Sequence, residues 1–170
     1  MDMILYMEYD KEEKQTHLRM IDHSEMIVHH AIPYIVDQLC QMYACTYEGR
    51  KQAIMRALGI KQKIPILLSE QSNDFFFPVT CIRKHHTYWL NYRYIEKVRQ
   101  LSNVCEISLH DFILYLPIDS RVVKAQMKRC VCYLQYLEAF KHRDSWKWLK
   151  VEGHPKYAYS IYTDEKMNAL

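Results

Sequence analysis

A basic segment in the first half of the chain holds the residues best suited to bind a ligand. Residues 45–63, CTYEGRKQAIMRALGIKQK, carry five bases and one acid. The five bases are Arg50, Lys51, Arg56, Lys61 and Lys63. Clustered positive charge attracts polyanions such as a nucleic-acid backbone. The competing interpretation is a solvated helix face, because Lys and Arg are the residues most often exposed.

The charge of the whole chain is small but unevenly placed. Its 170 residues have a formal net charge of +3. Residues 1–28 hold seven acids against three bases, residues 48–63 hold five bases against one acid, and residues 121–150 hold eight bases against two acids. This segregation favours a polyanionic partner, since it produces local fields that the net charge hides. For residues 121–150 the solvated interpretation is the stronger one, because long amphipathic helices routinely carry lysines on their wet side.

Aromatic and basic residues also recur together along the chain. Tyr47 lies next to the Gly-Arg-Lys run at 49–51, Arg83 and Lys84 precede two histidines, and Arg93 lies between two tyrosines. Such mixtures suit phosphate contacts and stacking on bases. They favour a nucleic-acid partner over a purely solvated surface.

Signatures of catalysis and of metal binding are missing from the sequence. There is no glycine-rich phosphate loop and no Gly-x-Ser-x-Gly element, and the chain has only three glycines. Nine His and six Cys include no Cys-x-x-Cys or His-x-x-x-His pair, and Cys130 and Cys132 diverge if they lie on a helix. We therefore expect no enzyme, no metal and no cofactor, with the cysteines acting as small buried hydrophobes.

Nothing in the sequence predicts export or a membrane anchor. No apolar run approaches the ~20 residues of a membrane span, and the first residues are acidic where a signal peptide is basic. The cysteines lie in apolar stretches without the spacing of a disulfide framework. We expect a cytoplasmic protein with no membrane partner.

Hydrophobic periodicity predicts an α+β fold: a single domain over residues 1–170 with antiparallel β-hairpins, a helical segment at about 33–58 and a long C-terminal helix. The expected strands are residues 3–9, 15–21, 64–69, 74–82, 86–95, 103–109 and 112–117, and the expected helices are residues 33–43, 48–58 and about 120–142. Residues 144–170 are rich in aromatics but receive no assignment.

Residues that are typical of helix and strand ends support these boundaries. Pro33 suits the first turn of a helix, Gly59 suits a helix C-cap, and Asp119 or Ser120 suits the N-cap of the last helix. Pro65 and Pro78 favour strand edges or ends, because proline has no N–H to donate. The last helix has a mainly apolar face that also contains a glutamine, Gln126.

Several stretches, in order, resemble the ComK family of competence transcription factors. CTYEGRKQAI resembles the family's Tyr-x-Gly-Arg-Lys element and follows a helix, IVDQLCQMYA, as it does in the family. IPILLSEQSNDFFFPV resembles its strand, short turn and aromatic-Phe-Pro strand, and YWLNYRYIEKV its Trp-containing segment. FILYLPIDSRVVKAQMKRCVCYL has its strand entering a long helix. The resemblance runs from about residue 25 to residue 140.

The resemblance implies a DNA-binding activator of competence genes that reads AT-rich double-stranded promoter DNA, mainly through the minor groove. It also implies a homo-oligomer, a dimer or tetramer. The matched element contains Tyr47, Gly49, Arg50 and Lys51, with Gly49 expected in a tight turn that brings the backbone near phosphate. Arg50 and Lys51 are the preferred DNA contacts. Further DNA contacts are nominated on charge alone: Arg56, Lys61, Lys63, Arg83 and Lys84.

An alternative function is a protein-interaction regulator that modifies another ComK-type protein without binding DNA. The chain departs from the family at Ile64-Pro65, where a double proline is common, and at Val79, where a threonine is common. Its aromatic tail would then be the binding surface, since exposed aromatics favour protein interfaces. Core packing is the competing interpretation of the tail aromatics, which are Trp146, Trp148, Tyr157, Tyr159 and Tyr162.

Overall fold

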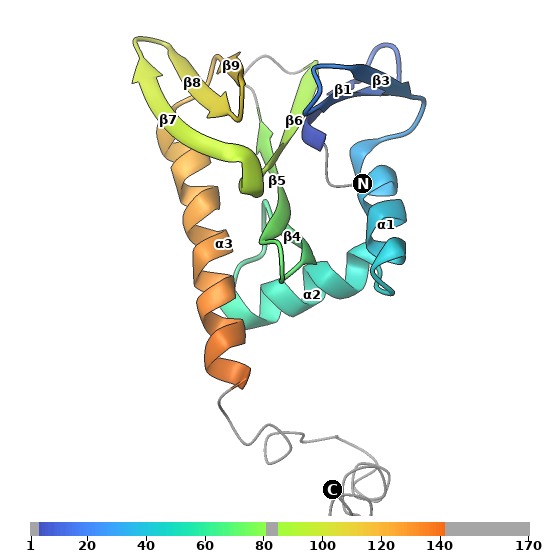
Figure 1. The fold of residues 1–170 in the computed structure, drawn as a ribbon, viewed down its shortest axis with the longest axis vertical. Coiled ribbons are helices and arrows are strands. Elements are labelled where there is room, and N and C mark those ends of the chain that lie inside the picture. The colour runs from blue at the N-terminus through green and yellow to red at the C-terminus, as the bar shows by residue number, and fades with distance from the viewer. Residues whose placement is uncertain (1–3, 81–84, 142–170) are drawn as a thin grey trace, which may run out of the picture. The chain divides into compact units, whose positions relative to one another are not determined.

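The computed structural model of the chain describes residues 4–80 and 85–141 (Figure 1). The chain divides into two units, residues 1–134 and residues 135–170. The described part of the second unit is the last stretch of a long helix. The aromatic tail, residues 144–170, which the sequence leaves unassigned, lies outside the described residues.

The larger of two sheets is antiparallel, with six strands in the order β3-β2-β1-β6-β5-β4. Its strands are β1 (Ile4–Asp10), β2 (Gln15–Met20), β3 (Glu25–Val28), β4 (Ile66–Ser69), β5 (Asp74–Thr80) and β6 (His86–Asn91). The charged turn between β1 and β2 forms because Asp10 Oδ1 accepts hydrogen bonds from the backbone N–H groups of Glu12 and Glu13, at 2.8 and 3.2 Å. Pairing of β1 with β6 joins the N-terminal strands to the middle of the chain.

Two consecutive helices, α1 (Ile32–Met42) and α2 (Tyr47–Leu58), follow β3. The apolar stripe predicted for α1 is the face that packs: Val36 and Cys40 are fully buried in a cluster that includes Met7 and Leu18 of the sheet. Pro33 occupies the first turn of α1, where its missing N–H would have no helical partner. The stripe therefore fixes which way α1 faces.

Three consecutive phenylalanines in β5 contribute to both faces of the sheet. Phe76 belongs to the cluster beneath α1, and Phe75 points to the opposite face because side chains alternate along a strand. The Phe75 ring meets Tyr92 and Tyr133 edge-on, with ring centroids 6.0 and 6.4 Å apart. Since Tyr133 lies on the last helix, β5 anchors that helix to the sheet.

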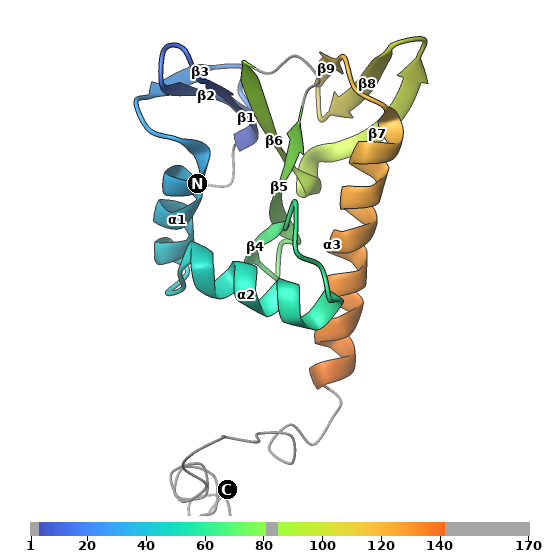
Figure 2. The same cartoon turned by 180° about the vertical axis from the view of Figure 1, so that it is seen from behind.

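A second, three-stranded antiparallel sheet has the order β7-β8-β9 and is seen from both sides in Figures 1 and 2. Its strands are β7 (Ile95–Leu101), β8 (Val104–Leu109) and β9 (Phe112–Leu116). One face is apolar and buried, and the other contains a buried carboxylate, Glu106. That carboxylate accepts hydrogen bonds from Arg99 Nε at 2.7 Å and Tyr115 Oη at 3.3 Å, which offset its desolvation.

The long helix α3 (Ser120–Lys141) begins with a side-chain cap. Asp119 Oδ1 accepts a hydrogen bond from the backbone N–H of Arg121 at 2.8 Å, so of the two predicted N-cap candidates, Asp119 and Ser120, Asp119 is the N-cap. Both carboxylate oxygens also accept from the Arg121 guanidinium. Side-chain and backbone hydrogen bonds from Arg121 lower the pKa of Asp119 from its ordinary 3.8 to about 2.

This cap predicts an acid-sensitive helix start. The folded-state pKa of Asp119 is depressed to about 2, so its stabilising contribution is present above pH 3.8 and lost as the pH falls through about 2. A carboxylate NMR titration should show Asp119 with a midpoint near 2. The Asp119→Asn variant keeps a capping oxygen and should lack this step. A midpoint near 3.8 for Asp119 would contradict the capped geometry.

The predicted α+β fold, its antiparallel hairpins, the helical segment and the long C-terminal helix are confirmed. Pro65 lies outside β4, and Pro78 lies beyond Phe76, where the pairing of β5 with β4 ends. The sequence does not predict β3 or β7.

The single strand predicted at 86–95 is wrong at its end, since a 3₁₀ turn replaces it at Tyr92–Tyr94. The cause is Asn91, which is 2 % exposed. Its side chain donates to Ile4 O at 3.0 Å and accepts from Arg93 N at 3.1 Å, and these bonds turn the chain out of the strand.

Candidate nucleic-acid interface

The basic segment is built on α2, whose two ends are fixed by local chemistry. Thr46 is the N-cap, and its Oγ1 accepts from the backbone N–H of Gly49 at 3.1 Å. Gly59 ends the helix with φ 65°, a left-handed conformation that glycine adopts without strain. The predicted helix and its C-cap are therefore confirmed, and the bases after Gly59 lie on the connection to β4.

Tyr47 and Gly49 of the matched element lie where they support the local structure of α2. Tyr47 is half-buried against the core cluster, 6.4 Å from the Trp89 ring, and burial raises the pKa of its phenol. Gly49 lies within the first turn of α2, so the predicted tight turn at this position is wrong. A side chain at Gly49 would place its Cβ 3.0 Å from Thr46 Oγ1 and crowd the cap.

Arg50 is half-buried and directed into the protein. Its Nε donates to Cys45 Sγ at 3.1 Å and its Nη2 donates to the Leu68 carbonyl at 3.3 Å, so it ties α2 to β4. The Cys45 thiol donates in turn to the Cys40 carbonyl at 3.1 Å. Burial beside Cys45 raises the pKa of Cys40 to about 12, which keeps that thiol neutral.

Lys51 is partly compensated by its neighbours. Its Nζ lies 3.1 Å from Glu48 Oε2 and 5.8 Å from the centroid of the Tyr47 ring. Hydrogen bonds from Gln52 and Lys51 hold the pKa of Glu48 below its ordinary value. The positive charge of Lys51 is therefore partly neutralised by Glu48 on the same helix.

Arg56, Lys61 and Lys63 differ from Arg50 and Lys51, because all three are exposed. Within residues 4–80 and 85–141, none of these three side chains makes an ion pair or a hydrogen bond. Lys63 also has φ 49°, a conformation that L-residues other than Asn and Asp adopt rarely. The connection from α2 to β4 thus presents uncompensated positive charge from a backbone that is held in an uncommon conformation.

Two side chains of α3 hold this connection in place. Gln126, only 2 % exposed, donates from Nε2 to the carbonyls of Lys63 at 3.0 Å and Pro78 at 2.9 Å. Arg129 Nη1 donates to the carbonyls of Gln62 and Lys63, both at 2.9 Å. Figures 1 and 2 both show α3 running beside the connection between α2 and β4. We call Gln126 and Arg129 the α3 clamp.

The position of Pro78 in β5 explains why Gln126 of the α3 clamp can bond to this strand. Among the described residues, no strand pairs with β5 beyond Phe76 on its β4 side, and Pro78 has no N–H to leave unpaired there. Its carbonyl is free to accept from Gln126. Charge alone nominates Lys61 and Lys63, and it does not predict the clamp. The one available signal in the sequence is a glutamine, Gln126, inside the apolar face of α3.

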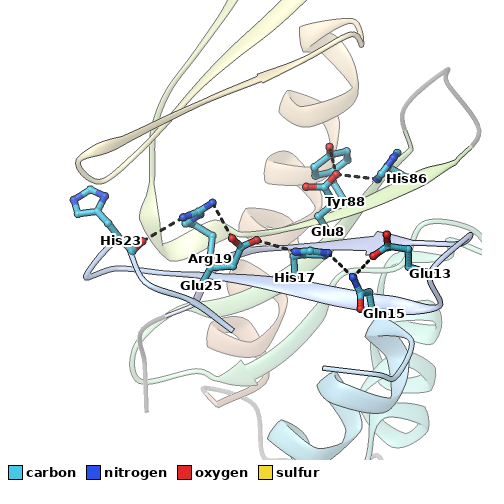
Figure 3. A network of polar contacts seen from close by, with 9 residues as sticks. All are labelled: Glu8, Glu13, Gln15, His17, Arg19, His23, Glu25, His86 and Tyr88. Atoms are coloured by element: carbon cyan, nitrogen blue, oxygen red, sulfur yellow. Dashed lines mark hydrogen bonds and ion pairs between the residues drawn. The ribbon is translucent and has the colours of Figure 1, made fainter. Parts of the chain in front are cut away.

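Of the other nominated residues, Arg83 and Lys84 lie outside the described part of the chain. On the half of the six-stranded sheet formed by β1, β2, β3 and β6, acidic side chains are paired with neighbouring residues (Figure 3). There, Glu25 pairs with His17 at 2.8 Å and Arg19 at 3.7 Å, and Glu8 accepts from Tyr88 Oη at 2.6 Å. The acids of this region thus have local partners, unlike the lysines after Gly59.

The described residues contain no cluster of three or more His, Cys, Asp or Glu side chains placed to bind a metal ion. Among the described helices, none combines the length and the apolar character needed to cross a bilayer.

The family assignment comes from a sequence comparison. The family model described as ComK protein matches residues 1–141. The chain belongs to the ComK family. The match covers every helix and strand described above, including β1 and β2, which precede the region of resemblance that begins at about residue 25. ComK proteins are competence transcription factors rather than enzymes, so this chain is a transcription regulator of the competence type. No curated protein and no solved structure matches it.

Proposed function

We propose that this ComK-family protein binds AT-rich promoter DNA and activates genes for DNA uptake, without a cofactor. The observation that carries the proposal is the set of exposed cations without ion partners in the described chain: Arg56, Lys61 and Lys63. Lys51, at the start of the same helix, is a further contact whose pairing with Glu48 is exchanged for phosphate. Arg83 and Lys84 stay nominated on charge alone.

The preference for AT-rich DNA follows from groove shape. A-tracts have a narrow minor groove with enhanced negative potential, and an inserted Arg or Lys gains energy there without reading individual bases. Long cationic side chains on a fixed connection, such as Lys61 and Lys63, fit this mode. Binding as a dimer or tetramer would place several such connections along one promoter. A second ComK-type protein would join the same assembly as a further partner.

The proposal predicts binding that depends on both salt and base composition. Fluorescence anisotropy with an AT-rich and a GC-rich duplex of equal length should show tighter binding to the AT-rich duplex. The logarithm of affinity should fall linearly with the logarithm of salt concentration, by about 0.9 for each phosphate contact. A steep slope without an AT preference would reduce the proposal to nonspecific binding.

Absence of binding at moderate salt would contradict the proposal. The function would then be the alternative, a regulator that joins another ComK-type protein without contacting DNA. Mixing the chain with such a partner and measuring the partner's DNA affinity would separate the two functions.

A further inference from the structure

The strand β3 forms one edge of the six-stranded sheet (Figures 1 and 2). Within the described residues, no strand pairs with it on the side away from β2. Met26 and Ile27 of this strand are 53 % and 51 % exposed, although both are large and apolar. Edge strands that stay unpaired usually carry lysine, proline or a β-bulge, and β3 has none of these. It is therefore an edge open to a further strand.

The open side of β3 presents the backbone groups of Glu25 and Ile27. Met20 N–H donates to Ser24 O at 3.0 Å, so these two residues form a hydrogen-bonded pair at the turn between β2 and β3. Such pairs occur at every second residue of an antiparallel ladder, so Met26 is the next residue of β3 that bonds to β2. The N–H and C=O groups of Glu25 and Ile27 therefore point away from β2.

The one charged side chain of β3 does not protect this edge. Glu25 lies 2.8 Å from His17 Nδ1 and 3.7 Å from Arg19 Nη2, both on β2 (Figure 3). Its charge is compensated within its own sheet, so an added strand would not leave an isolated carboxylate at the contact. The apolar side chains of Met26 and Ile27 decide what this edge can bind.

The sequence of β3 is complementary to itself when two copies pair antiparallel. A two-fold axis at Ile27 places Ile27 opposite Ile27 of the partner copy, and Met26 opposite Val28 of the partner copy. Apolar side chains then meet on each face, and the outward backbone groups of the two Ile27 residues bond to each other. The same register places Glu25 opposite His29, whose imidazole can donate to the carboxylate.

Other registers lose this match. An axis at Met26 keeps the backbone pairing but places Glu25 opposite Ile27, an acid against an apolar side chain. An axis between two residues sets side chains of different faces against each other, because a strand alternates with period two.

We propose that β3 is the self-association edge of this protein: two copies pair antiparallel through β3 about a two-fold axis at Ile27, and their six-stranded sheets join into one. This inference rests on the proposed function, whose homo-oligomer it supplies with an interface. A two-fold pairing is closed, so it produces a dimer and leaves no open β3 edge for further growth.

The test measures self-association of the full chain without DNA, by sedimentation equilibrium over a range of protein concentrations. Ile27→Lys places two like charges opposite each other across the axis and should raise the dimer dissociation constant by at least about tenfold. Ile113→Lys is the matched control, because Ile113 is 49 % exposed and lies on β9, an edge strand of the other sheet. Both isoleucines are exposed, so both variants should keep the wild-type circular dichroism spectrum.

A charge exchange at Ile27 tests the register. The axis makes residue 27 its own partner, so an equal mixture of Ile27→Lys and Ile27→Glu should restore the dimer that neither variant forms alone. The corresponding mixture at Ile113 should behave as the wild type. An axis at Met26 predicts instead that Ile27→Lys alone associates more tightly, since its lysine would meet Glu25, and that result would overturn the register.

A monomeric wild type would overturn the inference, as would an Ile27→Lys variant that dimerises like the wild type. Loss of the dimer in Ile113→Lys alone would move the interface to the second sheet and exclude β3. DNA binding is measured separately, by anisotropy. A wild type that dimerises through β3 but does not bind AT-rich DNA would remove the proposed function and leave the β3 interface standing.

Discussion

Replacing Gln126 with methionine should lower the free energy of unfolding by about 2–4 kcal/mol. Methionine fits the space of glutamine but donates no hydrogen bond, so the carbonyls of Lys63 and Pro78 lose their Nε2 donor. An unsatisfied buried polar group costs about 1–3 kcal/mol, and two groups are affected. Arg129 still reaches the Lys63 carbonyl, which keeps the loss below the sum. Urea unfolding monitored by circular dichroism measures the change.

Gln38→Met is the matched control, because Gln38 is an exposed glutamine on α1. Its unfolding free energy should stay within about 0.5 kcal/mol of the wild type. The Gln126→Met variant should also bind DNA less tightly at a temperature where it remains folded, since residues 59–63 are then free to move. A variant as stable as the control would show that the buried amide does not hold the connection.

Local periodicity is sufficient to predict the elements that bury one continuous stripe. In α1 the spacing of Ile35, Val36 and Cys40 is itself the packing surface, so the helix and its orientation can both be read from the sequence. β3 has no such signal: its four residues are exposed or only partly buried, and its pairing with β2 specifies it. A short exposed strand that is specified by its pairing partner has no hydrophobic periodicity from which it could be predicted.

The break after β6 shows the same limit. Residues 86–95 alternate as a strand should, but Asn91 bonds to the Ile4 carbonyl 87 positions earlier and turns the chain. In the interface, charge alone nominates Lys61 and Lys63. Their fastening depends on Gln126, 63 positions away from Lys63, so no local pattern predicts it.

The role that the sequence predicts for Arg50 differs from the role that its geometry supports. The family element suggests a DNA contact, whereas the structure gives Arg50 Nε and Nη2 partners inside the protein. We propose that Arg50 acts by positioning α2 on β4. A guanidinium can bridge two acceptors because its donors are fixed in one plane, and no other side chain reproduces that fork.

Replacing Arg50 with methionine should therefore lower the free energy of unfolding by about 1.5–3 kcal/mol, the range for hydrogen bonds from a charged donor. Arg56→Met is the contrast, since Arg56 is exposed and has no partner among the described residues. It should change stability by less than about 0.5 kcal/mol and reduce the salt slope of DNA binding by about 0.9. Arg50→Met should leave that slope unchanged under conditions where it is folded. The reverse pattern, a stable Arg50→Met protein with a lower slope, would return Arg50 to the DNA-contact role that the family element suggests, because a positioning residue affects folding first and phosphate contacts only through it.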